Sequence, residues 1–252
     1  MHLYFISDLH LSNDDQDNLA SFAVFINSII ENHSRLYILG DLFDVWIGDD
    51  DTSTPLIENL IPLFKKLKDK NVTTFFCHGN RDFLLGETFA SLMSVNLLEE
   101  KTILYFQDKK ILLMHGDQLC TDDHDYQQFR SMVRSTEWQQ KFLSKPLAKR
   151  REMAVNMRIE STKNNKNKSL DIMDVNKDSV SSLMQDESID ILIHGHTHRP
   201  AFHAIKSGPQ GKTRVVLGDW DKNEKVLLLS DGLMKFCSIK KNALQVIREQ
   251  II

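Results

Sequence analysis

Five short polar motifs, each placed directly after an apolar run, constrain this chain more than any other feature. The motifs are Asp8-Leu9-His10, Gly40–Asp44, Gly79–Asp82, His115-Gly116-Asp117 and Gly195–His198. The runs before them have the composition of buried strands: HLYFI (2–6), RLYIL (35–39), TTFFC (73–77), ILLM (111–114) and DILIH (190–194). Because ligands bind at the carboxyl ends of strands in a doubly wound sheet, we expect the motifs to meet at one edge.

The rhythm of the apolar runs predicts an α/β fold. Residues 19–30 and 56–67 repeat apolar side chains at helical spacing between the first strands, which indicates βαβ units with largely parallel pairing. After residue 199 the runs VVLG, KVLLLS and LMKFCSI are separated only by the polar turns DKNE and DG, which favour antiparallel hairpins. We therefore expect a two-sheet β-sandwich flanked by helices.

A basic block interrupts this rhythm. Between Arg130 and Lys168 there are eleven Lys/Arg and three Asp/Glu, although the whole chain of 252 residues has a net charge of only −4. Residues 125–161 have a helical period, and the polar run TKNNKNKS (162–169) is typical of a mobile loop. We interpret residues 125–170 as an inserted helical cap between two parts of one core, 1–124 and 171–252. The basic block suits an anionic substrate or membrane surface, or is simply a solvated helix face.

The motif residues offer carboxylate, amide and imidazole donors and no thiolate. Such donors suit Mn²⁺, Fe²⁺ or Zn²⁺. In extended backbone, the spacing of two residues in Asp8/His10 and in His196/His198 points both side chains to one side. One metal would leave donors over, whereas two metals about 3.5–4 Å apart would use them all, with one carboxylate bridging. The pattern predicts a two-metal phosphoesterase in which an activated water attacks phosphorus.

The ordered motifs DxH, GDxxD, GN, H and GHxH resemble the calcineurin-like metallophosphoesterase superfamily, and they extend from Asp8 to His198. This resemblance implies a two-sheet sandwich flanked by helices and two metal ions. It implies that one metal is held by Asp8, His10, Asp41 and His198. It implies that the second is held by Asp41, Asn80, His115 and His196, with Asp41 as the bridge.

Position 81 departs from the common superfamily pattern. Many members have a histidine after the asparagine, whereas this chain has Arg81. A guanidinium stabilises developing negative charge but is a poor proton donor. An alkoxide leaving group needs a proton, whereas a phosphate monoester, with its second pKa near 6, does not. Arg81 therefore favours a pyrophosphate substrate, and we assign catalytic roles to Arg81, Asn80 and Asp41.

A narrower resemblance rests on the blocks ISDLHL, GDLFDVWIGDD, GNRDFLLG, MHGDQLCTDD, DIMDVN and IHGHTHRP, which are similar to those of the UDP-2,3-diacylglucosamine hydrolases. It implies a Mn²⁺-dependent pyrophosphatase of lipid A synthesis. The water attacks the α-phosphate and releases UMP and 2,3-diacylglucosamine 1-phosphate. It also implies a cytoplasmic enzyme, peripheral to the inner face of the cell inner membrane. The implied substrate contacts are Asn80, Arg81, Asp123, Ser161, Asn165, Lys168 and His196.

The cap can serve a diacylated substrate in two ways. Its apolar residues can line an acyl groove or form the cap's own core: Leu143, Leu147, Met153, Val155, Met157 and Ile159. Its basic residues can rest on anionic lipid: Lys141, Lys145, Lys149, Arg150 and Arg151.

Two rival functions remain open from sequence. One is another phosphodiesterase or nucleotide pyrophosphatase of the same superfamily, or a nuclease. Within the basic block only Trp138 offers a stacking aromatic, so we expect no nucleic-acid partner. The other rival is a non-catalytic scaffold, which should lack some metal donors, whereas here every donor position is filled.

Compartment and assembly are less constrained by the sequence. Cys77, Cys120 and Cys237 are expected to be free thiols in a reducing compartment, and the start of the chain shows no leader pattern. The roles of Cys120 and His194, the acyl length, the metal used in the cell, the movement of the cap and the oligomeric state stay open.

Overall fold

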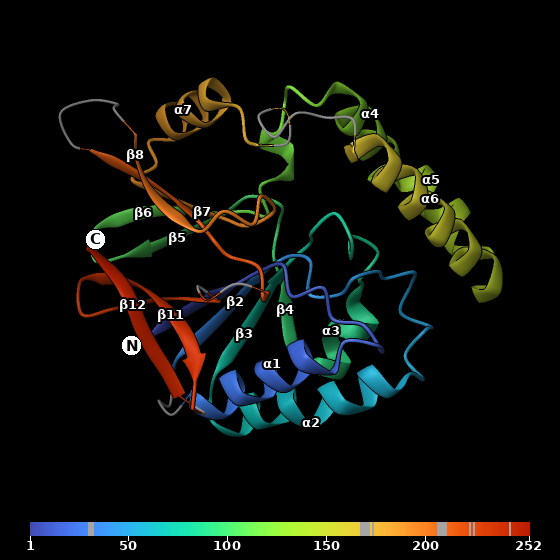
Figure 1. Ribbon diagram of the computed structural model, residues 1–252, viewed down its shortest axis with the longest axis horizontal. Coiled ribbons are helices and arrows are strands. Elements are labelled where there is room, and N and C mark those ends of the chain that lie inside the picture. The colour runs from blue at the N-terminus through green and yellow to red at the C-terminus, as the bar shows by residue number, and fades with distance from the viewer. Residues whose placement is uncertain are drawn as a thin grey trace.

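The computed structural model contains two β-sheets packed face to face, with helices on their outer faces (Figure 1). It describes residues 1–29, 33–166, 172, 174–205, 211–221, 223, 225–241 and 243–252. The seven-stranded sheet has the order β12-β11-β10-β1-β2-β3-β4, and the five-stranded sheet has the order β5-β6-β7-β9-β8. The predicted two-sheet sandwich flanked by helices is confirmed.

The first half of the chain builds the parallel part of the larger sheet. Strands β1 (Leu3–Ile6), β2 (Arg35–Leu39), β3 (Thr73–Cys77) and β4 (Val95–Leu97) pair in parallel. They are connected by α1 (Gln16–Ser28), α2 (Pro55–Asp69) and α3 (Glu87–Met93). The side chains of Asp15 and Thr54 accept backbone N–H groups at the starts of α1 and α2, which explains where these two helices begin.

The last strands complete the larger sheet in antiparallel fashion. They are β10 (Val226–Ser230), β11 (Leu233–Lys240) and β12 (Ala243–Ile251). The turn between β10 and β11 is Asp231-Gly232, and both residues have positive φ (54° and 76°), as a tight hairpin requires. This predicted hairpin is confirmed.

The smaller sheet is formed later in the chain. Its strands are β5 (Thr102–Phe106), β6 (Lys109–Leu113), β7 (Ile191–His194), β8 (Ala201–Ile205) and β9 (Lys212–Val216). A short 3₁₀ turn, η1 (Asp117–Leu119), follows β6, and α7 (Lys177–Asp186) precedes β7. The expected hairpin between VVLG and KVLLLS is wrong, because β9 pairs with β7 and β8 while β10 belongs to the other sheet.

The two faces of β1 pack against different parts of the core. Leu3 and Phe5 face the smaller sheet, where they pack in one cluster with Ile111 and Ile193. Tyr4 and Ile6 belong to the cluster on the helical side. A fully buried aliphatic or aromatic side chain contributes about 1.5–3 kcal/mol, so a strand buried on both faces is strongly held in register.

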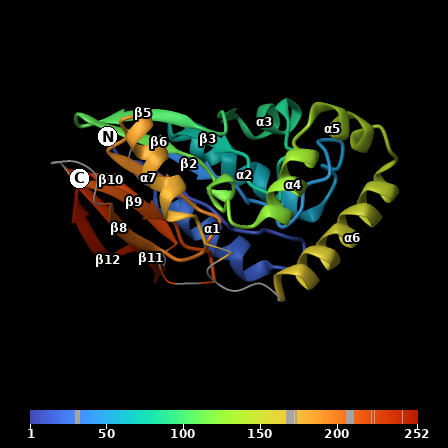
Figure 2. The same cartoon turned by 90° about the horizontal axis from the view of Figure 1, so that it is seen from above.

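Three helices follow the fourth motif and lie to one side of both sheets (Figures 1 and 2). They are α4 (His124–Val133), α5 (Thr136–Leu143) and α6 (Leu147–Lys166). The expectation of a loop from residue 162 is wrong for 162–166, which continue α6. This stretch contains no glycine or proline, and the hydroxyl of Thr162 donates to the carbonyl of Arg158 at 2.9 Å, as it does inside a helix.

Candidate metal centre

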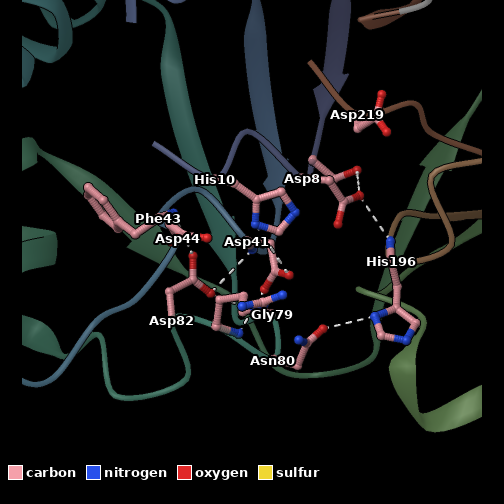
Figure 3. Close-up of polar contacts among 12 residues, drawn as sticks. Asp8, His10, Asp41, Phe43, Asp44, Gly79, Asn80, Asp82, His196 and Asp219 are labelled. Atoms are coloured by element: carbon pink, nitrogen blue, oxygen red, sulfur yellow. Dashed lines mark hydrogen bonds and ion pairs between the residues drawn. The ribbon is translucent and has the colours of Figure 1, made fainter. Parts of the chain in front are cut away.

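The strand-end motifs converge at one edge of the two sheets, as Figure 3 shows for Asp8, His10, Asp41 and Asn80. Two groups of donors lie close enough to hold an ion, with ligand atoms within 4.8 Å of one another: Asp8, His10 and His198, and Asp8, Asp41 and His115. Asp8 belongs to both groups, whereas the sequence pattern singled out Asp41 as the shared carboxylate.

Asn80 and His196 complete the cluster. The Oδ1 atom of Asn80 lies 2.9 Å from Nε2 of His115 and 2.8 Å from Nδ1 of His196. The backbone N–H of His196 donates to Oδ2 of Asp8 at 2.9 Å. The structure therefore brings all seven predicted donors into one connected group.

In Asp8 and in Asp41, one carboxylate oxygen accepts a hydrogen bond and the other faces histidine rings. Oδ2 of Asp8 accepts the Ser7 hydroxyl at 2.6 Å, while Oδ1 lies 3.3 Å from Nε2 of His198. Oδ1 of Asp41 accepts the backbone N–H of Arg81 at 2.8 Å, while Oδ2 lies 3.8 Å from Nε2 of His115 and 3.9 Å from Nδ1 of His10. This arrangement leaves one oriented oxygen on each side chain for a cation.

The histidines are oriented through their second ring nitrogens. Nδ1 of His115 lies 2.8 Å from the carbonyl of Leu39, and Nδ1 of His198 lies 3.1 Å from Oδ2 of Asp219. A partner on one nitrogen selects the tautomer that leaves the other available to a metal. Asp219 was missed by the sequence analysis, although Gly218-Asp219 follows an apolar run just as Gly40-Asp41 does.

The backbone at the donors is strained. Five donors have left-handed φ values: Asp8 (56°), His10 (50°), Asp41 (53°), His196 (68°) and His198 (54°). Such conformations cost on the order of 1–3 kcal/mol each and persist where the surrounding structure enforces them, typically at functional sites. At Gly79 a Cβ atom would lie 2.1 Å from Oδ1 of Asp41, so only glycine allows this approach.

The loops that carry the donors are tied together by two further carboxylates. Asp82 is fully buried and accepts the backbone N–H groups of Leu42 at 2.8 Å and Gly79 at 2.9 Å, with longer bonds from Asp41 and Phe43. Asp117 accepts the Tyr126 hydroxyl at 2.7 Å and Nε of Arg130 at 2.8 Å, which joins the fourth motif to α4. Both carboxylates therefore orient the loops around the donors through hydrogen bonds.

Electrostatics indicate a site that favours bound cations. Burial raises the pKa of Asp41 to about 7, because its charge is removed from water among other carboxylates. Burial lowers the pKa of His10 and of His196 to about 4, so both are neutral imidazoles with lone pairs available at neutral pH. Burial acts against the charge of His198 as well, but hydrogen bonds to Asp219 and Asp8 raise its pKa to about 10.

The donor set fits divalent metal ions. Nδ1 of His10 is buried without a hydrogen-bond partner in the described part of the chain, and Oδ1 of Asp8 faces only Nε2 of His198, at 3.3 Å. Buried polar atoms are normally paired, so His10 requires a partner that the described residues do not supply. Carboxylate oxygens facing imidazole nitrogens at 3.3–3.9 Å are suited to a cation between them.

The predicted substrate contacts are distributed between the centre and the cap. The guanidinium of Arg81 has no hydrogen bond or ion pair within the described residues, whereas Oδ1 of Asp123 accepts the N–H of Tyr126 at the start of α4. Ser161 is exposed on α6. Lys168 lies outside the described residues, as does the side chain of Asn165.

The predicted lipid contact of one basic cap residue, Arg150, is wrong. Arg150 is only 2% exposed and donates to the carbonyl of Ile47 and to both carboxylate oxygens of Asp50. It therefore cannot rest on a membrane surface, and it holds α6 to the loop after β2. Arg151 and Arg158 pair with Asp51 and Asp44 on the same side of α6.

Cys77, Cys120 and Cys237 are buried and form no disulfide, as expected. Burial raises the pKa of the Cys120 thiol to about 12, which argues against a role as nucleophile.

Among the described residues, no helix has the length and apolar character needed to cross a bilayer.

Similarity to known proteins agrees with this geometry. A family model for calcineurin-like phosphoesterases matches residues 1–200. The UDP-2,3-diacylglucosamine hydrolase of Haemophilus influenzae (strain PittGG) is 45% identical over 239 residues, covering 95% of this chain and 99% of that protein. The enzyme of that name from Shigella dysenteriae serotype 1 is 46% identical over 220 residues, covering 87% and 91%.

Among solved structures, vacuolar protein sorting 29 from Cryptosporidium parvum is similar with a TM-score of 0.50 and 13% identity, covering 100% of this chain and 98% of that one. At this identity the likeness concerns the fold alone.

Proposed function

The chain belongs to the calcineurin-like phosphoesterases and, within them, to the UDP-2,3-diacylglucosamine hydrolases, and from this premise we propose its reaction. Water attacks the α-phosphate of UDP-2,3-diacylglucosamine, and the pyrophosphate bond breaks. The products are UMP and 2,3-diacylglucosamine 1-phosphate, an intermediate of lipid A synthesis. The observation that carries the proposal is the convergence of the seven donors on one edge of the sheets.

We propose that these donors hold two divalent ions, most suitably Mn²⁺: Asp8, His10, Asp41, Asn80, His115, His196 and His198. Bound there, the ions would supply Lewis acidity at the phosphorus and acidify the attacking water. The protein's own part is orientation. Ser7 and the N–H of Arg81 each fix one carboxylate oxygen, and Asp219 fixes one imidazole, so the opposite donor atoms need no rearrangement.

Arg81 is proposed to stabilise the charge that develops on the leaving phosphate. Its guanidinium is unpaired within the described residues, and its own backbone N–H is fixed on Asp41 beside the centre. The leaving group is a phosphate monoester that needs no proton, so a permanently charged side chain suffices. Asn80 and His196 are proposed to contact the substrate from the same cluster, and Asp123, Ser161, Asn165 and Lys168 are proposed as further substrate contacts.

An apolar pocket beside the centre supports a diacyl substrate. It has a volume of about 560 Å³ and lies between α6 and the loops after β1 and β2, with Leu11, Phe43, Trp46 and Val155 in its walls. Leu11 directly follows His10, so the pocket opens next to the metal donors. Burying acyl chains there is worth about 0.8 kcal/mol per CH₂ group.

The other cap residues proposed for the groove divide into two sets. Leu147, Met153 and Met157 pack against the core, while Leu143 and Ile159 are exposed. On this basis we propose that residues 125–170 form an inserted unit between core segments 1–124 and 171–252, and that it covers the acyl chains.

Membrane contact is a separate proposal. With Arg150 buried and Arg151 exposed but paired with Asp51, the basic side chains left for anionic lipid are those of Lys141, Lys145 and Lys149, which are exposed or half-buried. Sedimentation with vesicles of increasing anionic lipid content tests it, since binding that ignores both salt and lipid charge would contradict it.

The reaction is tested by following UMP release from UDP-2,3-diacylglucosamine with and without Mn²⁺. We expect metal-dependent release and no hydrolysis of cyclic AMP or single-stranded DNA. Faster cleavage of alkyl phosphodiesters than of nucleotide-sugar diphosphates would contradict both the substrate and the role given to Arg81. A chain that retains less than one metal equivalent after loading would favour a scaffold instead.

A further inference from the structure

A second pocket lies beside the smaller sheet and next to the metal donor His198. It has a volume of about 340 Å³ and is lined by residues from the loop before α7, the last motif, β8 and β9. Small-molecule sites have volumes of about 300–1,000 Å³, so it can hold a nucleoside-sized group. It shares no lining residue with the acyl pocket.

The walls of this β8–β9 pocket hold two buried polar groups without partners. Arg214 is only 9% exposed, yet its Nε atom has no hydrogen-bond partner, and no ion pair forms on its guanidinium within the described residues. The hydroxyl of Thr197 is likewise buried and unpaired. An unpaired buried charge is strongly unfavourable, because burial removes its hydration without replacing it. We therefore expect the pocket to bind a ligand that carries hydrogen-bond acceptors.

The position of the pocket indicates which part of a substrate would enter it. His198 lines the pocket and also lies 3.3 Å from Asp8 through its Nε2 atom, so the pocket and the metal centre share a wall. The acyl pocket is lined by Leu11, the residue after His10, and by Asp44, among other residues. A molecule with acyl chains at one end and a pyrophosphate in the middle would thus extend its other end toward β8 and β9.

The pocket offers hydrogen-bond acceptors as well as donors, which suits a nucleoside better than a second phosphate. Arg199 pairs with Asp174 at 2.7 Å, and Asp174 lines the pocket together with His203. The Asp174 carboxylate beside the two arginines can accept a hydroxyl or an imide N–H of a nucleoside. Carbonyl oxygens of a pyrimidine and hydroxyls of a ribose match this mixture of donors and acceptors.

We propose that the β8–β9 pocket binds the nucleoside end of the substrate, with Arg214 donating to oxygens of the base or ribose. This rests on the proposed hydrolysis of a nucleoside-diphosphate sugar, and it adds a recognition site for the nucleoside half. UMP and uridine are the probes for it. Inorganic phosphate separates nucleoside binding from simple anion binding at the metal donors.

The test compares Arg214→Met with Lys212→Met in the Mn²⁺-loaded protein. Lys212 lies two residues earlier on the same face of β9 and is not part of the pocket, so its variant loses the same charge at a matched place. Calorimetric titration gives the affinities of UMP, uridine and phosphate, and thermal unfolding gives the stability. Arg214→Lys keeps the charge but loses the planar guanidinium group. It should bind UMP more tightly than Arg214→Met and more weakly than the wild type.

Arg214→Met should weaken UMP binding by about ten- to a hundredfold, the worth of a charged hydrogen bond, while phosphate binding stays unchanged. Its melting temperature should match or exceed that of the wild type, because an unpaired buried charge is removed. Three results would overturn the proposal: UMP affinity equal to that of Lys212→Met, equal weakening of UMP and phosphate, or a melting temperature several degrees lower, which would make Arg214 structural.

The outcomes also separate this pocket from the proposed reaction. If Arg214→Met loses UMP binding but the wild type releases no UMP from UDP-2,3-diacylglucosamine, the proposed reaction is refuted and the proposed nucleoside site is supported. If the wild type turns over and Arg214→Met binds UMP normally, only the pocket assignment fails.

Discussion

Replacing Asp82 by alanine should destabilise the fold and loosen the metal centre together. The side chain is fully buried and connects the loop that carries Asp41 to the loop that carries Asn80, through backbone N–H groups of both. Removing the carboxylate leaves these donors unpaired, because no other described side chain accepts from Leu42 or Gly79.

The magnitude follows from the bond lengths. The bonds from Leu42 (2.8 Å) and Gly79 (2.9 Å) are short, and those from Asp41 (3.3 Å) and Phe43 (3.4 Å) are weak. At about 1.5–3 kcal/mol per hydrogen bond to a charged group, the two short bonds give about 3–6 kcal/mol. For a chain of this size that lowers the melting temperature by about 6–24 °C. Because burial raises the pKa of Asp82, measurement at pH 8 favours the ionised carboxylate more than measurement at pH 7 does.

Asp49→Ala is the matched control. Asp49 accepts the indole N–H of Trp46 at 3.1 Å and the backbone N–H groups of Gly86 and Phe89 at 2.9 Å each, away from the metal donors. Both variants should melt earlier, but only Asp82→Ala should also bind Mn²⁺ about ten- to a hundredfold more weakly. A melting temperature for Asp82→Ala within about 2 °C of wild type, or equal loss of metal from both variants, would refute the reasoning.

Three further predictions concern the donors themselves. Asp41→Ala should bind fewer than two Mn²⁺ ions and release no UMP, as metal analysis and the UMP assay would show; full occupancy would contradict its place in the centre. Because the pKa of His198 is about 10, metal binding must displace its proton, so the Mn²⁺ affinity should rise about tenfold per pH unit between pH 7 and 9 in calorimetry, and a flat profile would contradict this. Asp219→Asn should lower the pKa of His198 in an NMR titration of the metal-free chain, whereas an unchanged titration would remove Asp219 from the account.

The parts of the fold that could be predicted from sequence are those set by local pattern. Strands β2 and β3 match the predicted bounds, because short runs of apolar, aromatic and β-branched residues end abruptly at polar motifs. Strands β4, β5, β8 and β12 were not predicted, since each is short or mixes exposed and buried residues without a clear run. Apolar pattern identifies a buried strand but says little about an edge strand.

Contacts between distant segments could not be predicted in this way. The sequence separates β9 from β10 by a short polar turn, yet they join different sheets, because β9 is paired with β7. Arg150 looks like a surface cation within a basic block and is buried because Asp50, 100 residues earlier, pairs with it. Arg214 carries no local signal either, and its importance is seen only where β9 forms a pocket wall.

The candidate site was more predictable than the sheets around it. The convergence of the motifs could be predicted because strand ends gather by topology, whatever the order of the strands, and the resemblance to the superfamily singled out seven candidate donors among them. Asp219 was overlooked because its role depends on contact with His198, although Gly218-Asp219 repeats the pattern of the other motifs.

The most direct test of the account counts the ions and measures how close they lie. The purified chain is loaded with Mn²⁺, freed of excess metal, and analysed for metal content and by electron paramagnetic resonance. A centre built from donors this close predicts two ions per chain and a spin-coupled spectrum, because ions about 3.5–4 Å apart interact strongly. One ion or fewer, or two ions with an uncoupled six-line spectrum, would contradict a shared two-metal site.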